Sequence, residues 1–163
     1  MTSFEPWKDF FAASVGAASA LAGLVFVALS INLDRILKFR GLTARSGETI
    51  VLLSAALFAS LLGLAPIHSP HGLAYTLMAV ALCAWGPTMR SQLAEWRTRE
   101  AATRPQLVRR VLLHQLATLP LVVASVGVLA AWDGAPYALA IGIVLSLAVG
   151  LLNAWVLLVE IMR

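Results

Sequence analysis

Charged residues are scarce in this sequence, and their scarcity argues against an ordinary soluble fold. Asp, Glu, Lys and Arg make up 12% of the 163 residues, whereas soluble globular domains carry about 25%. So few charged residues cannot cover the surface of a globular protein. The outer surface must then be largely apolar, which implies that it faces lipid. Hydrophobic residues account for 60% of the chain, which agrees with that inference.

Cysteine and catalytic motifs are also lacking. The single cysteine, Cys83, lies in an apolar segment, which excludes an intramolecular disulfide and a multi-cysteine metal site. The eight acidic residues avoid the centres of the apolar segments. The sequence has no Ser–His–Asp spacing, zinc-protease motif or phosphate-binding loop. We therefore expect a protein that is not an enzyme, with no catalytic residues, no metal site and no cofactor.

Apolar segments long enough to cross a membrane dominate what is present. The first covers 24 uncharged residues, 10–33. At about 1.5 Å per residue it would reach roughly 36 Å, which exceeds a hydrocarbon core of ~30 Å. The pattern predicts an all-α integral membrane protein in which residues 1–163 form a single transmembrane domain, a small bundle of five helices. The expected spans are 10–33, 49–67, 73–89, 111–131 and 137–159, with loops at 34–48 and 90–110.

The basic residues predict how these spans are oriented. Of the 12 Lys and Arg residues, all but Lys8 lie in the 34–48 loop, the 90–110 loop or at Arg163. In a five-span chain these three places share one side of the membrane. The positive-inside rule then puts the N-terminus outside and the C-terminus in the cytoplasm. We expect a multi-pass protein of the plasma (inner) membrane, and the basic pI then reflects orientation rather than binding to nucleic acid.

Small residues recur at helical spacing in the first and fifth spans. Residues three or four apart share one helix face, and small residues let helices approach closely in lipid. Two interpretations remain open: the two spans pack against each other within one chain, or these faces join separate copies in a homo-oligomer. The predicted packing stripes consist of Gly16, Ala20 and Gly23 in the first span and Gly142, Ser146 and Gly150 in the fifth.

Polar residues gather at the expected cytoplasmic ends of three spans. Polar groups in a bilayer tend to face the bundle interior and to find partners. One interpretation is a polar vestibule that handles ions or protons; the other is hydrogen bonding between helices together with charges at the interface. The candidate vestibule contains Ser30, Asn32, Asp34, His114, Gln115, Asn153 and Glu160.

Two further groups of residues have both a functional and an ordinary interpretation. The arginines of the 90–110 loop fit contact with anionic lipid headgroups at the cytoplasmic face, or docking of an acidic partner. His68 and His71 could share a metal, although their turn contains no carboxylate or cysteine. The predicted headgroup contacts are Arg90, Arg97, Arg99, Arg104, Arg109 and Arg110.

The stretches GAASALAGLVFVALSINLDRIL, from Gly16, and GLTARSGETIVLL, from Gly41, carry a resemblance. They resemble the opening of a group of small bacterial membrane proteins catalogued without a function. The resemblance covers about the first 60 residues of the chain. It implies a prokaryotic multi-span protein and no particular activity.

These features together predict a small membrane channel or channel-like pore that self-associates in the lipid bilayer, with ions as candidate permeants. Rings of small and weakly polar residues around a symmetry axis can select ions, and the first span leads to Ser30, Asn32 and Asp34. The alternative is a non-catalytic structural or regulatory subunit that docks on another membrane protein through the same stripes.

Overall fold

Helices make up nearly all of the described chain. The computed structural model describes residues 4–38, 40–66, 69–98 and 104–162, and no strand occurs among them. This confirms the all-α class. Five of the helices, all but the short α2 (Leu33–Lys38), are long and apolar enough to cross a membrane, which confirms the five candidate spans. A 3-10 turn precedes the first helix. The elements are η1 (Glu5–Trp7), α1 (Lys8–Ile31), α2 (Leu33–Lys38), α3 (Arg40–Leu64), α4 (Pro70–Thr98), α5 (Arg104–Leu129) and α6 (Ala135–Met162).

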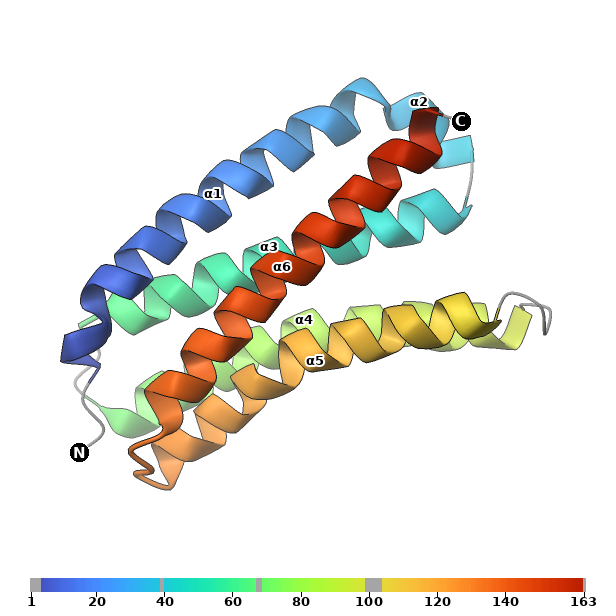
Figure 1. Cartoon of the computed structure of the whole chain (residues 1–163). Helices are drawn as coiled ribbons and strands as arrows, with labels where there is room; N and C mark the ends of the chain where they lie inside the picture. Colours follow the sequence, from blue (N-terminus) through green and yellow to red (C-terminus); the bar gives the residue numbers. More distant parts are fainter. Residues whose placement is uncertain (1–3, 39, 67–68, 99–103, 163) are drawn as a thin grey trace.

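Four of the long helices form a bundle, and α1 lies beside it. Each of α3, α4, α5 and α6 packs against two others of the four, whereas α1 packs mainly on α3 and only lightly on α6. The chain runs up and down, so the termini lie at opposite ends (Figure 1). We call the end that holds α2, the end of α4, the start of α5 and the end of α6 the arginine-rich end.

Alanines and other small side chains fill much of the interior beside buried leucines, and many large apolar side chains point outward. Ala56, Ala81 and Ala124 are buried, whereas Ile31 on α1 and Trp155 on α6 are 78% and 67% exposed. Lipid tails are as apolar as a protein core, so large outward side chains cost little in a membrane, while small inward ones allow close helix approach. The distribution therefore suits a bundle surrounded by lipid.

Glycines mark the closest approaches between helices. A Cβ added at Gly63 on α3 would lie 2.8 Å from the ring of Phe11, which is fully buried and anchors α1. A Cβ at Gly142 would lie 2.6 Å from Leu121 on α5. These contacts fix how α1 seats on α3 and how α6 seats on α5.

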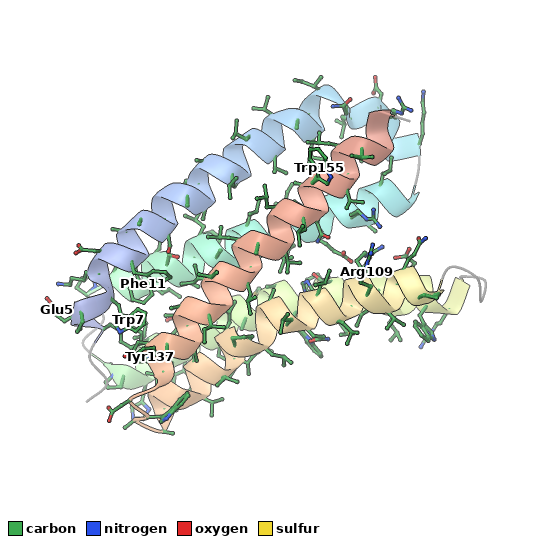
Figure 2. All side chains as sticks on the ribbon, in the orientation of Figure 1. Glu5, Trp7, Phe11, Arg109, Tyr137 and Trp155 are labelled. Atoms are coloured by element: carbon green, nitrogen blue, oxygen red, sulfur yellow. The ribbon has the colours of Figure 1, made fainter. Side chains whose placement is uncertain are left out.

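Aromatic rings gather at the end opposite the arginines. The rings of Trp7 and Tyr137 meet edge to face, with centroids 4.7 Å apart, and so join η1 to the start of α6. Phe11 lies close by at the same end (Figure 2). Aromatic side chains favour the boundary between hydrocarbon and headgroups.

The helices extend well beyond the apolar segments, so the predicted loops are largely helical. Residues 40–48 belong to α3, and α4 continues through Pro87 to Thr98 rather than ending near Met89. Residues 104–110 form the start of α5. Hydropathy marks where a chain leaves the hydrocarbon, but a helix satisfies its own backbone and need not end there.

Candidate functional site

A group of polar side chains lies near the arginine-rich end, among α3, α4 and α5; four of them are buried, and the Glu95 side chain is 14% exposed. We call it the buried cluster, and its members are Glu48, Gln92, Glu95, Arg110 and His114. All five belong to helices that could span a membrane. Charged residues at such positions are expensive and are functional-site candidates by default.

Helical spacing explains how three separate segments supply this cluster. Gln92 and Glu95 are three residues apart on α4, and Arg110 and His114 are four apart on α5, so each pair shares one helix face. Glu48 enters from α3. Because α4 packs against both α3 and α5, the three faces meet inside the bundle.

Arg110 is the centre of the cluster. Its Nε donates to Glu48 Oε2 at 2.9 Å and its Nη2 donates to Glu48 Oε1 at 2.8 Å, a bidentate pair. The same Nη2 lies 2.9 Å from Glu95 Oε2. Arg110 is 7% exposed and Glu48 is 3% exposed. One guanidinium thus ties α5 to α3 and α4 through charge-assisted bonds, the stronger kind of hydrogen bond.

Gln92 and His114 complete the cluster with unused polar atoms. Gln92 Nε2 donates to Glu48 Oε1 at 3.2 Å, but Gln92 Oε1 is buried without a hydrogen-bond partner in the described part of the chain. Both ring nitrogens of His114 are also buried without a partner of good geometry, although the Ala84 backbone lies near the ring. The cluster therefore keeps hydrogen-bonding capacity next to its ion pairs.

Within one chain, the described residues of the predicted vestibule lie apart from one another. Ser30 donates to Phe26 O and Asn32 to Ala28 O, both within one turn, and Asp34 is exposed on α2. Gln115 accepts a 3.0 Å hydrogen bond from Trp85 Nε1 of α4.

The remaining vestibule residues belong to α5 and α6. Asn153 is buried in α6, and the Glu160 side chain lies outside the described part of the structure. No hydrogen bond or ion pair joins two of the described vestibule residues. Of the vestibule residues, only His114 lies in the buried cluster. The sequence indicates how far along its helix each residue lies, but it does not decide which way the side chain faces.

The two small-residue stripes have different surroundings. Gly142, Ser146 and Gly150 pack within the chain: Ser146 Oγ donates to Ala117 O of α5 at 3.3 Å, and a Cβ at Gly150 would lie 2.9 Å from Leu53 of α3. The α6 stripe therefore packs on α3 and α5 rather than on α1.

The stripe of the first span faces outward. Gly16, Ala20 and Gly23 are exposed on α1. A Cβ at either glycine would meet nothing within 4 Å.

The arginines also divide into two groups. Arg90, Arg97 and Arg109 are exposed, as headgroup contact requires; Figure 2 labels Arg109 on α5. Arg110 is buried in its ion pairs, so its assignment to headgroups is wrong: the adjacent residue on a helix points about 100° away. Arg99 and the Arg104 side chain lie outside the described residues.

Metal binding finds no support in the described part of the chain, where no group of three or more His, Cys, Asp or Glu side chains could hold an ion. The His71 ring stacks on Tyr75 with centroids 6.4 Å apart. His68, the other half of the candidate pair, is outside the described residues.

Sequence reasoning missed Glu48, Gln92 and Glu95. Both carboxylates have ordinary explanations in the sequence, because Glu48 lies just before an apolar segment, where a helix start favours negative charge, and Glu95 lies four residues before Arg99. A signal was nevertheless present, because Gln92 with Glu95 and Arg110 with His114 each form a polar face adjoining an apolar span.

The chain matches no protein-family model, no curated protein and no solved structure.

Proposed function

We propose that this chain is a non-catalytic subunit of a homo-oligomeric membrane channel or channel-like pore, with ions as the permeant class. The observation that carries the proposal is the outward small-residue face of α1. Gly16, Ala20 and Gly23 are exposed there, while the corresponding stripe of α6 is used inside the chain. Helix α1 is thus the span with an open face for close contact with another copy.

The same face continues into polar groups at the arginine-rich end. Steps of three or four residues lead from Gly23 through Val27 to Ser30, all exposed on α1, and Asp34 follows on α2. When several copies meet through α1, these residues form rings around the symmetry axis. A narrow path with hydroxyl and carboxylate rings at one mouth favours cations.

The membrane placement belongs to the same proposal. We place the arginine-rich end in the cytoplasm and the N-terminus outside, in the plasma (inner) membrane, because cations accumulate at one end of the bundle. In this arrangement the buried cluster keeps the cytoplasmic ends of α3, α4 and α5 together while α1 makes contact between copies.

Self-association is tested with Gly16→Leu and Gly23→Leu. Each adds bulk to the open face of α1, so we expect chemical cross-linking in lipid nanodiscs to give monomers instead of oligomers. Gly47→Leu is the matched control, because Gly47 is a helical glycine whose Cβ would also meet nothing within 4 Å. Unchanged oligomers in both variants would remove α1 as the contact between copies.

Conduction is tested by ion flux from liposomes that contain the purified protein. We expect cation flux that Gly23→Leu abolishes and Gly47→Leu preserves, and a loss of cation preference in Asp34→Asn. Absence of flux under every ion gradient and pH would reject the pore.

The alternative is a structural or regulatory subunit that docks on another membrane protein through α1. One observation favours it: Ser30 Oγ and the Asn32 amide already donate to carbonyls of α1, which leaves less polar capacity to line a water path. A stoichiometric second protein retained by the native chain and lost in Gly16→Leu, without self-association, would support this alternative.

A further inference from the structure

An apolar groove lies between the last turns of α4 and the first turns of α5, on the flank of the buried cluster. It encloses about 220 Å³. Its walls are Met89, Leu93 and Trp96 of α4 with Val108, Val111 and Leu112 of α5, and Gln92 supplies the one polar side chain.

The groove opens to the surroundings of the bundle. Leu112 is 63% exposed, Leu93 51% and Trp96 41%. In a membrane these side chains meet lipid, because both α4 and α5 are apolar and long enough to span it. The apolar walls suit an acyl chain, which gains van der Waals contact when it packs into the groove.

Positive charge lies at the end of the groove. Arg97 follows Trp96 directly and lies one turn beyond Leu93 on the same side of α4, nearer the end of the helix. Arg97 and Arg90, three residues before Leu93, are both exposed. An apolar groove flanked by cations at the end of a membrane span complements an amphiphile with an acyl chain and an anionic head.

We propose that this groove binds one acyl chain of an anionic phospholipid, with its phosphate paired to Arg97. The bound chain would contact Gln92, whose amide donates to Glu48 at 3.2 Å, so the lipid lies against one of the two α4 residues in the buried cluster. The site is formed within one copy of the chain and is independent of whether copies form a pore.

Trp96 in the groove wall reports occupancy through its fluorescence. The full chain is reconstituted in phosphatidylcholine vesicles with increasing fractions of phosphatidylglycerol carrying brominated acyl chains, and Trp96→Phe gives the signal to subtract. We expect brominated phosphatidylglycerol to reach half-maximal quenching at a mole fraction about fivefold lower than that of brominated phosphatidylcholine. This ratio is the gain in affinity expected from one contact between an arginine and an anionic headgroup.

Three variants separate a site from general lipid contact. Arg97→Gln should remove the preference for phosphatidylglycerol, and Val108→Phe, which fills the groove, should remove saturable quenching. Val123→Phe is the control, because Val123 is also an exposed valine of α5 but not a groove residue. Equal quenching by both lipids, saturable quenching that persists in Val108→Phe, or no quenching by either lipid would each overturn the proposal.

Discussion

The guanidinium of Arg110 is shared between carboxylates from two other helices. It forms a bidentate pair with Glu48 and a further ion pair with Glu95, in surroundings that leave it 7% exposed. Such pairs add little net stability over apolar packing, but removal of one partner leaves a buried charge without compensation. Arg110 therefore matters chiefly because Glu48 depends on it.

Substitution of Arg110 should test this dependence directly. We expect Arg110→Met to lower the free energy of unfolding in detergent micelles by about 3–5 kcal/mol, because Glu48 then stays buried and unpaired. Arg109→Met, one residue away and exposed, should change it by less than about 0.5 kcal/mol.

A double variant shows whether the pair acts as a unit. Glu48→Gln combined with Arg110→Met should be less destabilised than the sum of the two single variants, because neither buried charge of the pair remains. Additive effects would mean that Glu48 and Arg110 do not depend on each other.

Helices α1 and α6 carry similar stripes of small residues in different environments. On α6, Gly142 and Gly150 lie against Leu121 and Leu53 of neighbouring helices. On α1, Gly16 has open space around it. The spacing of the residues is nearly the same, so the position of each helix in the bundle decides what its stripe contacts.

This difference predicts opposite effects of the same substitution. Gly150→Leu should lower the free energy of unfolding of the single chain by about 1–3 kcal/mol or more, because the new leucine side chain would overlap Leu53. Gly16→Leu should leave that stability unchanged or raise it, since leucine is a better helix former than glycine. Thermal unfolding of monomers in detergent measures both, and equal losses would contradict the packing of α6 on α3.

Among the described residues, the arginines gather toward one end of the molecule, and the aromatic contact of Trp7 with Tyr137 lies at the other. The arginine-rich end contains α2, the end of α4, the start of α5 and the end of α6, and the other end contains the contact of Trp7 with Tyr137 (Figures 1 and 2). In a chain that crosses a membrane repeatedly, alternate connections lie on opposite sides, so this distribution fits the positive-inside rule.

Orientation is testable with single cysteines in a Cys83→Ser background. A membrane-impermeant maleimide should label Asp133→Cys in intact cells and Arg97→Cys only after permeabilisation. Both native side chains are exposed. Arg97 lies in the last turn of α4 and Asp133 lies between α5 and α6, and these two places are at opposite ends of the bundle (Figure 1). The reverse pattern of labelling would invert the proposed topology.

The number and approximate position of the five long helices followed from the sequence alone. A hydrophobic segment long enough to cross a membrane is a local property that any window of the chain reveals. The helix ends were predicted less well: polar residues 90–98 continue α4, since helical hydrogen bonding does not depend on hydropathy.

Only the tertiary structure decided which faces meet. Arg110 was visible as a cation and His114 as a polar group in a span, but their shared site with Glu48 and Glu95 depends on the rotation of three helices. The same rotations bury the stripe of α6 and leave that of α1 exposed. Burial and pairing arise from packing between segments distant in the chain, which local composition does not specify.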